Sequence, residues 1–153
     1  MKKIVFQCVG NILLFTFMAL AFLFPLSEVT QERYWIGGSL TIFPFLLIAY
    51  LIIYPVTYRL FAKKFQGGKG ANSELAYLDE REKTIVAEST KIAYKVLVGG
   101  LIFIIPAIGG VRFFSLFSGI EISIYSTSIV LLATLLNVAT VFYCIKWCLE
   151  YKK

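Results

Sequence analysis

The chain has 153 residues, of which 59% are apolar, more than the half that is usual in soluble domains. Its 15 Lys and Arg residues outnumber 9 Asp and Glu residues and give a net charge of +6, but these charges lie between apolar runs, so they indicate membrane topology rather than direct nucleic-acid binding. Histidine is absent, which removes the commonest general base and metal ligand, so we expect a non-enzymatic protein without a cofactor.

Four apolar runs follow one another along the chain, over residues 4–26, 35–58, 92–114 and 122–145. The hydrocarbon core of a bilayer is about 30 Å thick and needs about 20 residues of helix, so each run is long enough to cross it. The sequence therefore predicts an all-α membrane protein, a single four-span domain over 1–153 whose spans form two hairpins. The short connections over 27–34 and 115–121 are expected to be too small to fold alone.

The basic residues determine the predicted orientation, because Lys and Arg beside a span are retained on the cytoplasmic side. All of them except Arg33 and Arg112 flank the same side of the four runs. Both termini and the loop over 59–91 are therefore predicted to be cytoplasmic, in a multi-pass protein of the cell membrane. Aromatic residues near the span ends, Trp147 among them, are expected at the membrane interfaces.

Few polar groups, and no charged ones, occupy the middle of the runs. Asn11 and Asn137 lie about 12 Å from the predicted cytoplasmic ends of the first and fourth spans, so we predict a hydrogen bond between their amides. The alternative is that each amide bonds its own backbone or an adjacent helix. Small residues in the third span predict close helix packing, with a kink at Pro106; they are Gly99, Gly100, Gly109 and Gly110.

The three cysteines, Cys8, Cys144 and Cys148, fall near predicted cytoplasmic span ends. Thiols are kept reduced in the cytoplasm, so a structural disulfide is not expected. Cys144 and Cys148 are four residues apart and share a helix face, but two thiols without histidine or a second pair make a poor zinc site. We therefore expect these cysteines to serve helix packing.

The cytoplasmic loop contains a glycine-rich linker and then a helix that continues without a breaker into the third span. Asp79 is a candidate helix cap with Glu82 as its capping-box partner, and Asp79 also pairs with Lys83 four residues on. Glu80 and Arg81 have no such local roles, so we predict that they contact a partner. The alternative is that all five residues only solvate and start the helix.

This stretch resembles a known type of protein. Asp79-Glu80-Arg81, followed by Ile85, Ala87 and the helix of the third span, is similar to the same region of an uncharacterised prokaryotic family of small four-helix membrane proteins. Members of that family are often encoded beside small DNA-binding regulators, so the resemblance implies a regulatory or stress-related role. It implies no catalytic residue.

Two classes of function fit these features. The first is an integral membrane regulatory or accessory protein that holds a cytoplasmic partner, such as a transcription regulator, through its central loop. The second is a small transporter, channel component or immunity protein that protects against a membrane-active peptide or a toxic solute. The lack of mid-span charges disfavours an ion-coupled carrier. The lipid bilayer is a partner in either case, and self-association into a homo-oligomer is open in both.

Overall fold

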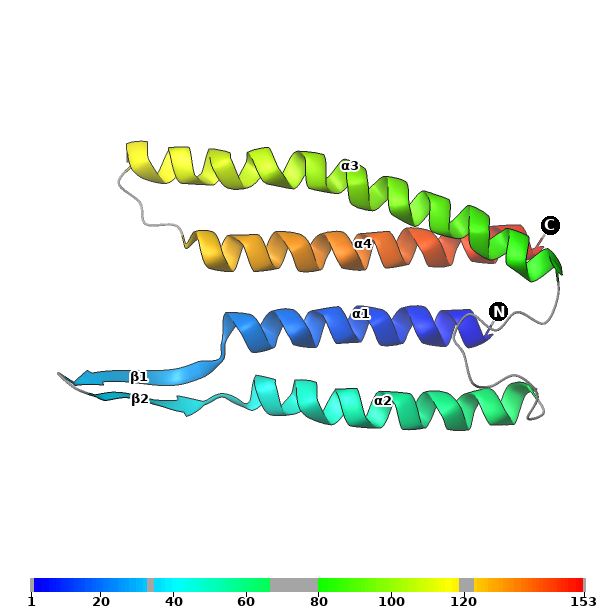
Figure 1. The fold of residues 1–153 in the computed structure, drawn as a ribbon, viewed down its shortest axis with the longest axis horizontal. Helices are drawn as coiled ribbons and strands as arrows, with labels where there is room; N and C mark the ends of the chain where they lie inside the picture. Colours follow the sequence, from blue (N-terminus) through cyan, green and yellow to red (C-terminus); the bar gives the residue numbers. More distant parts are fainter. Residues whose placement is uncertain (1, 33–34, 67–79, 119–122, 153) are drawn as a thin grey trace.

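The structure is a computed structural model that describes residues 2–32, 35–66, 80–118 and 123–152. Four helices and one β-hairpin follow in chain order (Figure 1): α1 (Lys2–Leu23), β1 (Leu26–Glu32), β2 (Trp35–Leu40), α2 (Ile42–Gln66), α3 (Glu80–Ser118) and α4 (Ile124–Lys152). The four helices contain most of each predicted apolar run. Each of them is long and apolar enough to cross a membrane.

The helices are apolar on their exposed surfaces as well as where they contact one another. Phe103 and Phe117 of α3 are each 78% exposed, and Ile52 of α2 is 64% exposed. Soluble monomeric proteins rarely expose contiguous apolar surface on this scale, because it is costly to hydrate. The helix surfaces therefore suit a lipid environment.

The helices lie side by side in the order α3, α4, α1, α2, as Figure 1 shows and the contacts between elements agree. The main contacts join α3 to α4, α4 to α1 and α1 to α2, with α3 and α4 in the most extensive contact. The layer has two ends. We call the end where α1 and α3 begin and α2 and α4 end the terminal end, because both chain termini lie there (Figure 1).

A β-hairpin replaces part of the predicted second span. β1 and β2 pair antiparallel, with Leu26 opposite Leu40 and Glu32 opposite Trp35, so α2 begins at Ile42 rather than at Trp35. The predicted start of the second span, at residue 35, is corrected here. Gly37-Gly38 disfavours helix by about 1 kcal/mol per glycine relative to alanine, while the β-branched and aromatic residues around it favour strands.

The first helix also ends earlier than predicted, at Leu23 rather than at residue 26. Pro25 follows and has no backbone N–H to continue the helix. Thr41, just before α2, bonds to this corner: its backbone N–H donates to the Pro25 carbonyl oxygen over 3.1 Å, and its hydroxyl donates to the Phe24 carbonyl. These bonds tie the start of α2 to the end of α1.

Tyrosines of α2 form the contact with α1. Tyr50, Tyr54 and Tyr58 are four residues apart and so share one helix face, on which successive rings lie 5.4 and 6.3 Å apart between centroids. The Tyr50 hydroxyl donates to the Gly10 carbonyl oxygen over 2.6 Å. Phe6 of α1 stacks on Tyr54, with the ring centroids 6.2 Å apart. This face holds α2 against α1.

Glycines allow close approach at one position in each of two helix pairs. A Cβ atom on Gly10 would lie 2.1 Å from a ring carbon of Tyr54, so α2 packs directly on the α1 backbone there. Among the four glycines of the third span, Gly100 alone abuts a neighbouring side chain, that of Leu135 in α4. The predicted close packing of α3 is therefore confirmed at Gly100 only.

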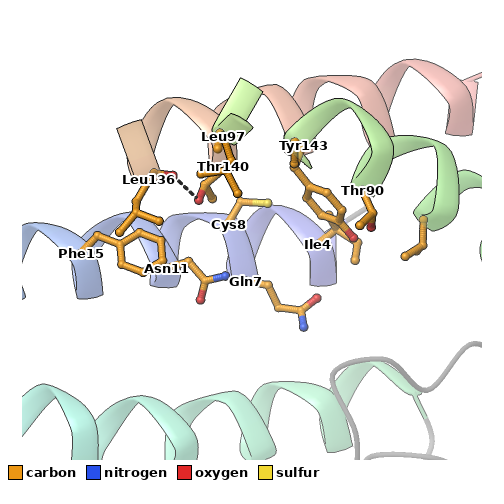
Figure 2. A pocket seen from close by; sticks show the side chains of 13 residues that line it. Ile4, Gln7, Cys8, Asn11, Phe15, Thr90, Leu97, Leu136, Thr140 and Tyr143 are labelled. Atoms are coloured by element: carbon orange, nitrogen blue, oxygen red, sulfur yellow. Dashed lines mark hydrogen bonds between the residues drawn. The ribbon is translucent and has the colours of Figure 1, made fainter. Parts of the chain in front are cut away.

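A groove runs along α4 between α1 and α3, toward the terminal end (Figure 2). Its volume is about 330 Å³. Side chains from all three helices line it: Ile4, Gln7, Cys8, Asn11 and Phe15 of α1, Val86, Thr90, Ala93 and Leu97 of α3, and Leu136, Ala139, Thr140 and Tyr143 of α4. The sequence alone did not indicate this groove.

We expect Gly10→Ala to destabilise the fold by about 1–3 kcal/mol, as overpacking typically does, because the rigid ring of Tyr54 must move away from the new methyl group. Gly99→Ala is the matched control, since a Cβ atom there meets nothing within 4 Å. Its helix propensity should make it neutral or slightly stabilising. Unfolding by SDS in mixed micelles measures both variants, and equal stabilities would contradict the tyrosine contact.

Candidate functional site

The third helix is much longer than a membrane requires. Its 39 residues extend about 58 Å at 1.5 Å per residue, whereas a bilayer core needs about 20 residues. The surplus lies mainly at residues 80–91, which precede the apolar run and hold most of the charges of α3. We call this segment, together with the last turns of α4 on which it packs, the stem.

One face of the stem segment is buried against α4. Ile85, Val86 and Trp147 form a buried cluster in which Trp147 is only 2% exposed. Ser89 is fully buried, and its hydroxyl donates to the Ile85 carbonyl oxygen over 2.8 Å, so its polar group is satisfied within the helix. The helix proposed from the sequence is thus an amphipathic one, docked through Trp147.

Trp147 does not lie where its position in the sequence predicted. It was expected at the membrane interface, but it lies beneath α3, with its ring stacked on Tyr151 at 4.9 Å between centroids. An aromatic residue near a span end suits either place, because its large apolar body gains free energy from burial in lipid or in protein. Trp147 is buried in protein rather than in lipid because α3 passes over it.

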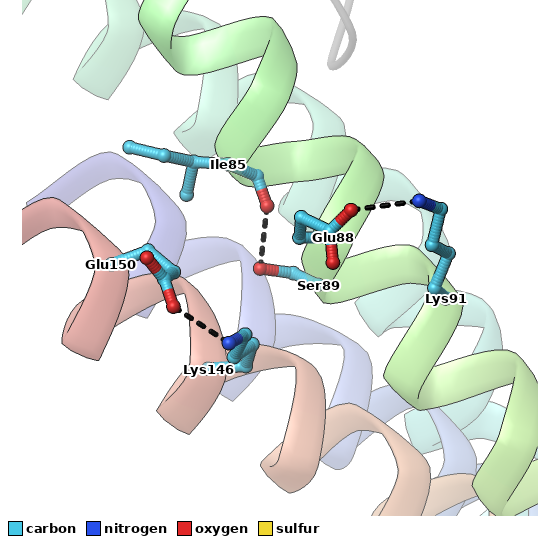
Figure 3. Close-up of polar contacts among 6 residues, drawn as sticks. All are labelled: Ile85, Glu88, Ser89, Lys91, Lys146 and Glu150. Atoms are coloured by element: carbon cyan, nitrogen blue, oxygen red, sulfur yellow. Dashed lines mark hydrogen bonds and ion pairs between the residues drawn. The ribbon is translucent and has the colours of Figure 1, made fainter.

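Two ion pairs lie near the docked face, as Figure 3 shows. Lys146 contacts Glu150 over 2.6 Å within α4, and Lys91 contacts Glu88 over 2.7 Å within α3. Both pairs are local, three or four residues apart. The Lys91–Glu88 pair is exposed and contributes little stability, whereas the Lys146 and Glu150 side chains are only 28% and 23% exposed. The stem surface therefore carries charges of both signs.

Glu80 and Arg81, the predicted partner contacts, begin this helix and are both exposed. The structure gives neither side chain a hydrogen bond or ion pair among the described residues, so both are available for another molecule. Asp79, the predicted cap, lies outside the described residues. The first turn of α3 does contain acidic residues, Glu80 and Glu82, which suit the positive end of the helix dipole.

The predicted partner of Asn137 is corrected. Its amide nitrogen donates to the Thr16 hydroxyl of α1 over 3.4 Å, and not to Asn11, which lines the groove. The reason is length: α4 continues to Lys152, beyond the predicted span end at 145. Counted from Lys2 and Lys152, Thr16 and Asn137 both lie about 21–22 Å along their helices, so these two residues meet.

The cysteines lie at the same end of the molecule. Cys8 is buried, Cys144 and Cys148 are partly buried, and all three are free thiols. Within the part of the chain that the structure describes, no group of three or more Cys, Asp or Glu side chains could hold a metal ion. Cys148 packs on the Trp147 cluster, which is a packing role.

Comparison of the chain with protein-family models, with curated proteins and with solved structures finds no match. The stem offers a docked helix with an exposed charged surface.

A double-mutant cycle distinguishes the two possible partners of Asn137. We expect Thr16→Val and Asn137→Leu to show a coupling energy of about 0.6 kcal/mol, the average for interhelical hydrogen bonds in membranes. The Asn11→Leu and Asn137→Leu pair should be additive, because those side chains do not bond. Unfolding free energies in SDS titrations give both couplings, and a larger value for the second pair would restore the pairing predicted from sequence.

Proposed function

We propose that the chain is a multi-pass membrane protein whose helices cross the bilayer as two hairpins, with the terminal end in the cytoplasm. Contacts between α1 and α2 and between α3 and α4 support the hairpins. The distribution of basic residues supports the orientation, because Lys and Arg beside spans are retained inside. The surplus length of α3 then extends into the cytoplasm.

Topology reporters test this orientation. A cytoplasm-active reporter fused after Lys153, or inserted within residues 67–70, is expected to be active, because nearly all basic residues flank that side. A reporter that functions only outside the cell membrane should be active when inserted at residues 33–34. The reverse pattern would overturn the orientation.

On this topology, the protein is a regulatory or accessory protein that holds a cytoplasmic protein partner through the stem. One observation carries the proposal: the first three turns of α3 exceed what the membrane needs, yet they pack on Trp147 of α4. A helix start that only needed solvation would not require a buried tryptophan beneath it. The docked face fixes the direction in which Glu80 and Arg81 project.

The first three turns of α3 are too small to form a whole protein interface by themselves. Residues 80–91 extend about 18 Å, and half the surface of a cylinder 10 Å wide and of that length is about 280 Å². Specific protein interfaces usually bury about 800 Å² per partner. The last turns of α4 must therefore contribute, and Leu149 and Tyr151, 56% and 40% exposed, supply apolar surface there.

The partner is a cytoplasmic protein with groups that complement both the negative charge of Glu80 and the positive charge of Arg81. A small transcription regulator is the leading identity, by the resemblance of the Asp79-Glu80-Arg81 region to the family described above. Sequestration of such a regulator at the membrane would be the regulatory act. No residue of this chain would then have to bind nucleic acid.

Charge reversal at the start of α3 tests the stem contact. We expect Glu80→Lys and Arg81→Glu each to lower partner recovery at least tenfold after purification in mild detergent, since a truncated interfacial charge pair costs about 2–5 kcal/mol. Arg112→Glu is the matched control, because it reverses a charge near the far end of the same helix. Membrane abundance is measured for all variants. Unchanged partner recovery at normal membrane abundance would mean that Glu80 and Arg81 only start the helix.

A further inference from the structure

The three cysteines gather in the contact between α1 and α4, toward the terminal end. Cys8 of α1 is buried, with only 4% of its surface exposed, while Cys144 and Cys148 of α4 are partly buried. The thiols of Cys8 and Cys148 each lie within hydrogen-bonding reach of the Cys144 thiol. Figure 2 shows the Cys8 side chain on the side of α1 that faces α4. Two helices that are far apart in the sequence therefore bring three nucleophilic groups together.

The register between these two antiparallel helices independently places Cys8 opposite Cys144. Thr16 and Asn137 are hydrogen-bonded across the same contact. Cys8 lies eight residues before Thr16, which is about 12 Å nearer the terminal end. Cys144 lies seven residues after Asn137, which is about 10.5 Å in the same direction. Positions seven and eight residues apart share the packing face of a helix, so the two cysteines lie at the same level of the contact.

The next turn toward the terminal end continues this pattern. Ile4 lies one turn before Cys8, and Cys148 lies one turn after Cys144. Both Ile4 and Cys148 pack on the Trp147 cluster. Cys144 therefore has one thiol neighbour across the helix contact and another on its own helix.

Geometry decides which two of the thiols are suited to a covalent bond. A disulfide needs Cβ atoms about 3.5–4.5 Å apart. Residues four apart on one helix, such as Cys144 and Cys148, have Cβ atoms about 5–6 Å apart, so a bond between them would distort the helix. The distance between α1 and α4 is not fixed in this way, because side-chain packing sets it. Cys8 and Cys144 are therefore the pair that can bond with the least strain.

Exposure assigns different roles to these two residues. Cys144 is partly exposed and lies two residues before Lys146, whose ion pair with Glu150 belongs to the polar end of α4. A small oxidant that arrives from this end meets Cys144 before it meets Cys8, which the packed helices cover. Access is one of the properties that make a cysteine susceptible to oxidation. Cys144 is therefore the first thiol to react, and Cys8 is the second.

We propose that Cys8 and Cys144 form a reversible disulfide on exposure to a hydroperoxide, as a redox modification site between α1 and α4. The Cys144 sulfur attacks the O–O bond and becomes a sulfenic acid, and the rest of the hydroperoxide leaves with the thiol proton as an alcohol or as water. The Cys8 sulfur then attacks the Cys144 sulfur, the S–S bond forms, and the sulfenic oxygen leaves as water with the second thiol proton.

The bond is reversible because a dithiol reductant restores both thiols by exchange and is itself oxidised to a disulfide. Transient disulfides of this kind occur in reducing compartments, where stable ones are rare. The bond ties α1 to α4 one turn from Trp147, beside the stem. The site does not depend on the proposed protein partner.

Oxidation of the full chain tests the site. The reduced protein in phosphatidylcholine nanodiscs is treated with an equimolar amount of hydrogen peroxide, and disulfides are mapped by mass spectrometry. We expect one intramolecular bond between the peptides that contain Cys8 and Cys144, and its complete reversal by dithiothreitol. The bond should form at least tenfold faster than in the SDS-unfolded chain, because the fold holds the two thiols together. Equal rates would overturn the proposal.

Nearly isosteric serine substitutions test the two roles separately. Cys8→Ser and Cys144→Ser should each abolish the bond, whereas Cys148→Ser, the matched control on the same face of α4, should leave its rate unchanged. Cys8→Ser should also leave the sulfenic acid of Cys144 open to trapping by dimedone, because the second thiol is missing. A bond between Cys144 and Cys148 in the unsubstituted chain, or failure to trap Cys144 in Cys8→Ser, would contradict the proposal.

Discussion

Burial of Trp147 beneath α3 is the contact on which the arrangement of the terminal end depends. It holds Ile85 and Val86 on α4, so the first turns of α3 stay beside α4 where the apolar run has not yet begun. Full burial of a tryptophan commonly contributes several kcal/mol, far more than the local ion pairs around it. The direction of the stem and the wall of the groove that Val86 and Thr90 form both follow from this contact.

The central position of α4 explains why the groove exists. Helices α1 and α3 both pack on α4, and α2 packs on α1, so the molecule is a layer and α4 is the floor between two walls. Small residues set the distances between the helices. Gly100 lets α3 approach Leu135, and Ala139 adds only one methyl group to the floor of the groove. In a soluble protein such a layer would leave too much apolar surface in water, but lipid removes that cost.

The stem and the groove differ in the character of their side chains and lie next to each other. The stem presents charges of both signs at the start of α3, which suits a protein partner that is recognised by electrostatic complementarity. Among the described residues, the lining of the groove contains apolar and uncharged polar side chains. Val86 belongs to both, so the groove and the stem share one buried cluster.

The sequence by itself determined the four apolar helices and the continuity of α3, because composition and the absence of breakers act locally and need no knowledge of neighbours. Tertiary structure decided the rest. The Gly37-Gly38 stretch is apolar enough to read as a span, yet its backbone pairs with β1 instead. Asn137 meets Thr16 because the true length of α4 sets the register between helices. Trp147 and the groove depend on which helices are neighbours, and side-chain periodicity gives the face of a helix but not what lies against it.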